Sequence, residues 1–180
     1  MPKIWSLFNR SSMSICSLSP EVVKDKVVVI TCNLDVPVKD GVIIDDTRLV
    51  ESIPTLKMIL DAEPKRLHIL AKMGRPKGKI VPELSQKVLV EPLEEHLGVS
   101  IEFRTDFEPG EGVVQLHENV RFHPGERKND PEFVEELRKI GGEVFVMDAF
   151  ATAHRNEASV VGLAQYMPAY PGLLVEKEIE

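Results

Sequence analysis

The sequence predicts an α/β domain in which helices flank a mainly parallel sheet. Short apolar segments alternate along the chain with longer segments whose apolar residues recur at helical spacing. Strands that are separated by helices in this way form βαβ units with right-handed crossovers. Of the 180 residues, 43% are hydrophobic, which is enough for one sizeable core and therefore for one domain.

Five short segments are expected to form the strands of this sheet. Residues 26–30 read Lys-Val-Val-Val-Ile, and a continuous β-branched run of this kind is typical of a parallel strand that is buried on both faces. The other expected strands are residues 66–71, 99–103, 113–117 and 143–147.

Two helices are expected in the first half of the chain. In residues 48–62, apolar side chains recur every three or four positions, and Asp46 or Thr47 can cap the amino end. A second helix is expected to begin at Pro82 and to end near Gly98.

Two further helices are expected in the second half. Residues 131–140 follow Asp130, a good N-cap residue, and Gly141 ends the segment. Residues 159–167 are expected to form a short helix, after which Pro168 and Pro171 end the regular structure.

Charge and cysteine content restrict the partners and the compartment. The chain has 22 Lys and Arg residues against 29 Asp and Glu residues, a net charge of −7. Nucleic acids and anionic membranes attract basic surfaces, so neither is expected as a partner. The chain has no run of about 18 apolar residues, so no transmembrane helix is expected. Cys16 and Cys32 show no metal-binding or disulfide pattern, which favours a reduced compartment, the cytoplasm.

The amino terminus differs from the rest of the chain. Residues 1–13 contain two cations, no acid and several large apolar side chains, among them Trp5, Leu7 and Phe8. A targeting peptide would have a longer apolar run or more Arg, so we expect a disordered leader, with Met1 or Met13 as the true start. Residues 14–180 are then the folded domain.

Polar and charged residues gather after the expected strands. Ligands of open α/β sheets bind outside the carboxyl ends of the strands, which share one edge. Arg forms forked, charge-assisted contacts with phosphate and carboxylate, and several Arg side chains around one site would repel one another without an anion. A small ligand with phosphate and carboxylate groups would satisfy them. The residues in these positions are Asn33, Asp35, Arg48, Lys72, Arg75, Arg121, Asp148, His154 and Arg155.

Each of these residues also has an ordinary structural interpretation. A single loop Arg can be a solvated surface charge, and Arg121 can pair with Glu118 or Glu126. Asp35 can be a turn former. The residues alone therefore indicate an anion-binding α/β domain and nothing narrower.

Other site types lack their patterns. The chain has no G-x-x-x-x-G-K-[ST] phosphate loop, and Gly110 and Gly112 do not extend to a dinucleotide-binding motif after the first strand. No Cys-His or Ser-His-Asp arrangement is singled out by spacing. The histidines do not suggest a metal site and are interpreted as structural or surface residues: His68, His96, His117 and His123.

Four segments together resemble the phosphoglycerate kinase family: VPVKDGVIIDDTR, MGRPKG, ENVRFHPGERKNDPEF and DAFATAHRNEAS. The resemblance covers residues 14–180. It implies the Rossmann-like, three-layer amino-terminal domain, which binds 3-phosphoglycerate or 1,3-bisphosphoglycerate. The carboxyl-terminal domain, which binds Mg-ADP or Mg-ATP in the family, is absent from these 180 residues, so no cofactor and no metal are expected here.

The resemblance also implies roles for four arginines. Arg48, in the D-D-T-R segment, would contact the substrate and neutralise the phosphoryl group during transfer. Arg75, Arg121 and Arg155 would hold the 3-phosphate of the substrate.

The chain departs from the family pattern close to this site. Thr31 stands where the family has Arg, and the Asp and Asn that contact the substrate are exchanged, as Asn33 and Asp35. Lys72 replaces a His near the phosphate, where it could act as a point charge. Because Asp35 would repel the carboxylate of the substrate, weakened binding is expected.

By this resemblance, the function is that of a glycolytic phosphotransferase acting between 1,3-bisphosphoglycerate and ADP. The isolated chain would be inactive, with a separately encoded nucleotide-binding half as a partner. Two alternatives remain open at this stage: a non-catalytic module that binds phosphoglycerate or another small anion, and a degraded remnant of reduced stability.

Overall fold

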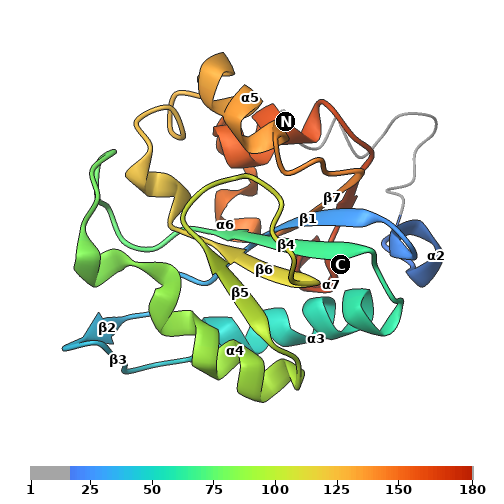
Figure 1. The fold of residues 1–180 in the computed structure, drawn as a ribbon, viewed down its shortest axis with the longest axis horizontal. Helices are drawn as coiled ribbons and strands as arrows, with labels where there is room; N and C mark the ends of the chain where they lie inside the picture. Colours follow the sequence, from blue (N-terminus) through green and yellow to red (C-terminus); the bar gives the residue numbers. More distant parts are fainter. Residues whose placement is uncertain (1–16, 180) are drawn as a thin grey trace.

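The computed structural model describes residues 17–179, which form a six-stranded parallel sheet between helices (Figure 1). The strand order is β5-β6-β4-β1-β7-β8, and every neighbouring pair is parallel. The strands are β1 (Val27–Cys32), β4 (Arg66–Ala71), β5 (Ile101–Arg104), β6 (Val114–His117), β7 (Val144–Asp148) and β8 (Ala169–Pro171). The predicted fold class and all five predicted strands are confirmed, with shifts of one or two residues at their ends.

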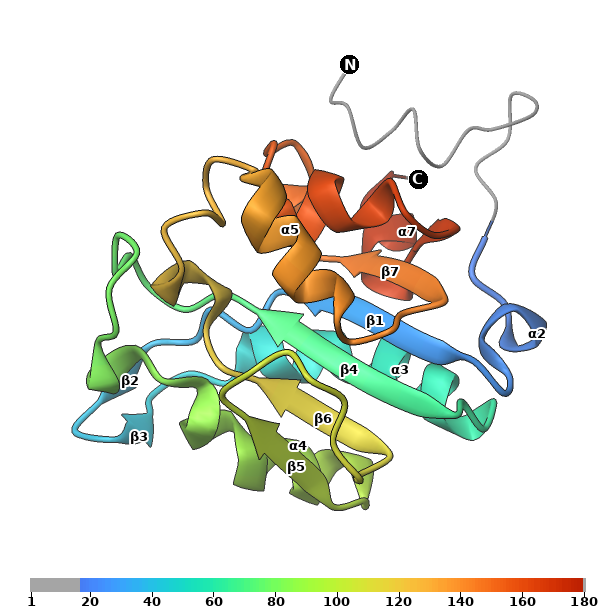
Figure 2. The same cartoon turned by 45° about the horizontal axis from the view of Figure 1, so that its top comes forward.

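Helices cover both faces of the sheet, which gives three layers (Figure 2). On one face, α3 (Thr47–Asp61) and α4 (Val90–Leu97) pack with the even-numbered side chains of β1. On the other face, α5 (Pro131–Arg138) and the π-helix η4 (Ala158–Gly162) pack with Val29 and Phe145. Because β1 is buried on both faces, its sequence is a continuous apolar run.

The single helix expected from Pro82 to Gly98 is wrong. Residues 82–89 form two 3₁₀ turns, η1 (Pro82–Leu84) and η2 (Gln86–Leu89), and only α4 is α-helical. Glu118 explains the break, because its carboxylate accepts hydrogen bonds from the Ser85 hydroxyl at 2.7 Å and from the Gln86 N–H at 2.9 Å. These bonds hold Ser85 in an extended conformation.

The carboxyl-terminal prediction is also wrong. Pro168 and Pro171 do not end the regular structure, because residues 169–171 form the edge strand β8 and α7 (Leu173–Ile179) follows. Proline has no backbone N–H to donate. An edge strand tolerates it because one side of the strand has no neighbouring strand that would need this hydrogen bond. The start of the helix expected over residues 159–167 lies in the π-helix η4, residues 158–162, in which the Glu157 carbonyl accepts the N–H groups of residues 160–162.

Among the described residues, five further short elements were not predicted: α2 (Pro20–Val23), β2 (Val38–Lys39) and β3 (Val42–Ile43), which form a hairpin, η3 (Val120–Phe122) and α6 (Phe150–Ala153). Asp46 is the N-cap residue of α3, as predicted, but its side chain makes no capping hydrogen bond. The carboxylate of Asp45 accepts the Thr47 N–H at 2.9 Å, and its bond to the Thr47 hydroxyl lowers the pKa of Asp45. The expected leader, residues 1–13, lies outside the described residues.

Two of the five histidines, His68 and His117, form a buried stacked pair, here called the histidine pair. His117 Nδ1 lies 2.7 Å from the Asp106 carbonyl, which can only accept, so Nδ1 carries the proton and Nε2 accepts from His68 Nδ1 at 2.9 Å. Burial, above all, lowers the pKa of His68 to about 3 and that of His117 to about 4. The histidine pair is therefore neutral and structural, as expected.

Candidate functional site

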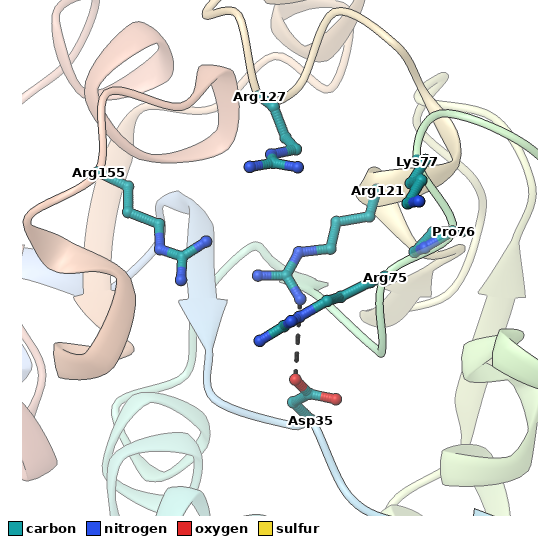
Figure 3. Close-up of a pocket in the computed structure, with 7 residues that line it drawn as sticks. All are labelled: Asp35, Arg75, Pro76, Lys77, Arg121, Arg127 and Arg155. Atoms are coloured by element: carbon teal, nitrogen blue, oxygen red, sulfur yellow. Dashed lines mark ion pairs between the residues drawn. The ribbon is translucent and has the colours of Figure 1, made fainter.

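A basic cavity lies where the loops after the strands converge at the carboxyl edge of the sheet (Figure 3). Its volume is about 420 Å³, and five cationic side chains line it against one carboxylate. The guanidinium groups of Arg121, Arg127 and Arg155 face a common space, and Lys77 lies at its rim. The lining residues are Asp35, Arg75, Pro76, Lys77, Arg121, Arg127 and Arg155.

A smaller recess of about 180 Å³ shares Asp35, Arg121 and Arg155 with this cavity. Arg48, Asn33 and Lys72 line it as well. The fold therefore brings seven of the nine residues predicted at this edge to two adjoining cavities.

Asp35 contacts three surrounding segments of the chain, at Arg48, Gly74 and Arg121. Its carboxylate accepts the Gly74 N–H at 2.9 Å and lies 3.7 Å from Arg121 Nη1. Its backbone carbonyl accepts from Arg48 Nη1 at 2.8 Å, which holds the first turn of α3 against the loop after β1. Arg121 therefore pairs with neither Glu118 nor Glu126, the two partners that the sequence suggested.

The loop of residues 74–78 is fixed against the Arg121 segment. Arg121 donates from Nη1 to the Gly74 carbonyl at 2.6 Å, and the Gly78 N–H donates to the Arg121 carbonyl at 3.1 Å. Gly78 has a φ of +75°, and a Cβ there would lie 2.9 Å from Pro124 Cα. Lys77 adopts a left-handed φ of +58°, a strained backbone conformation that the two neighbouring contacts maintain.

Lys72 is buried between two carboxylates. Its ammonium lies 2.5 Å from Glu157 Oε2 and 3.3 Å from Glu126 Oε1. Burial alone would raise the pKa of Glu157, but the charges of Lys72, Arg121 and Arg155 bring it below its ordinary value. Arg155 Nη1 lies 3.6 Å from the other oxygen, Glu157 Oε1.

Two cations of the cavity were missed by the sequence analysis. Lys77 stands in the same loop as Arg75, and Arg127 stands in the same loop as Arg121, so their position after strands β4 and β6 was the available signal. Within residues 17–179, no carboxylate forms an ion pair with Arg75, Lys77 or Arg127. These three positive charges are available to an anion.

The remaining residues of the predicted set lie elsewhere. Asp148 lines neither cavity, and its carboxylate accepts the Leu174 N–H at 3.1 Å at the start of α7. Burial raises the pKa of Asp148 to about 6. His154 is exposed and lines neither cavity.

In the part of the chain that the structure describes, no group of three or more His, Cys, Asp or Glu side chains could hold a metal ion. No helix of residues 17–179 has both the length and the apolar character that crossing a membrane requires.

The fold and the cavity define a class: a parallel α/β domain with an arginine-rich pocket, suited to small phosphorylated anions, at the carboxyl edge of its sheet. Comparison with known proteins narrows this class. The family model described as phosphoglycerate kinase matches residues 19–180, and the chain belongs to that family.

Individual relatives agree with this assignment. The phosphoglycerate kinase of Caulobacter vibrioides is 40% identical over an alignment of 178 positions that covers 93% of this chain and 44% of the relative. That of Thermus thermophilus is 46% identical over an alignment of 168 positions that covers 87% of this chain and 42% of the relative. The chain thus spans less than half the length of these relatives.

Solved structures show the same partial coverage. The phosphoglycerate kinase of Coxiella burnetii superimposes with a TM-score of 0.79 at 35% identity, covering 88% of this chain and 41% of that structure. For the phosphoglycerate kinase of Pyrococcus horikoshii, the TM-score is 0.73 at 31% identity, and the match covers 87% of this chain and 42% of that structure.

Proposed function

We propose that this chain is the phosphoglycerate-binding half of a phosphoglycerate kinase. In that role it contributes to glycolytic phosphoryl transfer between 1,3-bisphosphoglycerate and ADP in the cytoplasm. The observation that carries the proposal is the convergence of five cations on one cavity that contains a single carboxylate. A phosphorylated carboxylic acid supplies the negative charge that such a pocket lacks.

The arginines divide into two groups in this proposal. Arg75, Arg121 and Arg155 line the larger cavity and hold the 3-phosphate. Arg48 lines the smaller recess, from the start of α3, and neutralises the phosphoryl group during transfer. Phosphoryl transfer depends mainly on positioning and electrostatic stabilisation, and fixed guanidinium groups provide both.

The Mg-nucleotide would be held by a second domain encoded outside these 180 residues. The chain alone would therefore bind phosphoglycerate without turnover, and a nucleotide-binding half would restore transfer when the two halves close on the substrate.

A calorimetric titration with 3-phosphoglycerate tests the proposed site. Saturable binding is expected, and it should be lost in Arg155→Ala. Arg138→Ala is a matched control, because both arginine side chains are 41% exposed and each lies near a glutamate. Absence of binding by a folded wild-type chain would refute the proposed site.

A complementation assay then separates an enzyme half from a binding module. Addition of a separately made nucleotide-binding domain should give ATP-dependent turnover that Arg48→Ala lowers. Binding of 3-phosphoglycerate without turnover under any mixing condition would instead favour the non-catalytic module.

A further inference from the structure

We propose that Lys72 is a positioning residue that holds the Arg155 segment at the pocket through Glu157 and does not itself contact the substrate phosphate. This inference rests on the proposed function, because it assigns a role within the same site.

Lys72 connects three separate parts of the chain. It follows β4, whereas Glu126 lies in the loop after η3 and Glu157 lies between α6 and η4. The Lys72 and Glu157 side chains are each 5% exposed and that of Glu126 is fully buried. The three side chains therefore form an ion network that solvent does not screen.

The network extends to β1 through Ser159. Glu126 accepts the Ser159 hydroxyl at 2.6 Å and the Ser159 N–H at 3.0 Å, and the Ser159 carbonyl accepts the Thr31 hydroxyl at 2.8 Å. Thr31 pairs in register with Leu70, two residues before Lys72, so Thr31 and Lys72 lie on the same face of the sheet.

Thr31 is neutral and contributes a hydrogen bond, not a charge, to this network. Lys72 is the cation that lies between the two buried glutamates, Glu126 and Glu157.

The charges determine what Lys72 can do. One ammonium between two carboxylates leaves one negative charge in excess, and Glu157 directs its second oxygen to Arg155 Nη1 at 3.6 Å. Moving Lys72 to a phosphate would leave the buried Glu126 without an ion-pair partner and Glu157 with only the Arg155 contact, which costs more than one charge-assisted hydrogen bond returns. The arrangement instead holds Arg155 beside the cavity.

The two possible roles of Lys72 predict opposite effects of Glu157→Gln. If Lys72 positions Arg155, loss of the Glu157 charge should raise the Kd for 3-phosphoglycerate by about tenfold, the equivalent of one charged contact. If Lys72 binds phosphate directly, the same substitution frees its ammonium and removes a repelling charge, so the Kd should fall. Glu143→Gln, which alters an exposed Lys26 pair at 3.3 Å, is the control and should leave the Kd unchanged.

An NMR titration of the wild-type chain gives a second test that needs no variant. The Lys72 ammonium ¹⁵N signal should stay in place at saturating 3-phosphoglycerate, while the Arg155 guanidinium signals shift. A ligand-dependent shift of Lys72 with an unmoved Arg155, or a lower Kd in Glu157→Gln, overturns the inference and leaves the proposed function intact. Absence of wild-type binding overturns both.

Discussion

Asp35 is the one carboxylate in the basic cavity, and its removal should strengthen binding of an anion. In the wild-type chain, the Asp35 carboxylate accepts the Gly74 N–H at 2.9 Å and lies 3.7 Å from Arg121 Nη1. Asp35→Asn keeps an oxygen that can accept the Gly74 N–H but removes the negative charge that faces Arg121. Two unit charges near that separation attract by about 1 kcal/mol in water and about 4 kcal/mol at a typical protein surface. The Asp35 side chain is 37% exposed, so solvent screening favours the smaller value.

Release of Arg121 from this pair should lower the Kd for 3-phosphoglycerate roughly fivefold, the equivalent of about 1 kcal/mol. Calorimetric titration at fixed ionic strength measures the change, and the thermal midpoint should stay close to that of the wild type. Asp46→Asn is the control, because that carboxylate lies on the same loop but lines neither cavity. Unchanged or weaker binding in Asp35→Asn would show that the carboxylate assists the ligand, and would refute the reasoning.

Three further predictions concern the cavity, its loop and the histidine pair. Arg127→Gln should weaken 3-phosphoglycerate binding in calorimetry by about tenfold, and Lys57→Gln, an exposed cation outside the cavity, should not. Gly78→Ala should lower the urea midpoint of unfolding and weaken 3-phosphoglycerate binding, because the new methyl group would clash with Pro124 at a position with a left-handed φ. Gly98→Ala is the control: Gly98 also has a left-handed φ, +69°, but no atom lies near the new methyl group, so this variant measures the cost of the backbone conformation alone, about 1 kcal/mol. In the folded chain, the pKa values of His117 and His68 are about 4 and 3, so between pH 6 and 4 these two side chains bind two protons only after unfolding. The pKa of Asp148 in the folded chain is about 6, so in the same range this side chain binds one proton only while the chain is folded. The free energy of unfolding should therefore fall with decreasing pH, with a net slope of up to about 1.4 kcal/mol per pH unit, and urea titrations that show a flat or opposite slope would contradict this sign.

Sequence patterns were sufficient wherever the determining interactions are local or periodic. The apolar runs predicted five strands, and their alternation with helices predicted parallel pairing, because hydrophobic periodicity reports which side chains must be buried. The gathering of the arginines was predictable for a similar reason. Carboxyl ends of parallel strands share one edge, so Arg75, Arg121 and Arg155 had to approach one another, as the cavity shows.

The tertiary structure alone decided which charges meet. Glu118 interrupts the expected helix by accepting a hydrogen bond from Ser85. Asp35 forms an ion pair with Arg121, and two glutamates that are distant in the sequence lie on either side of Lys72. None of these pairs has a fixed spacing along the chain, because Coulomb attraction and desolvation depend on separation and burial in space. The sequence by itself thus determined the fold and the basic edge of the sheet, whereas the packing of the loops determined which cations remain free to bind an anion.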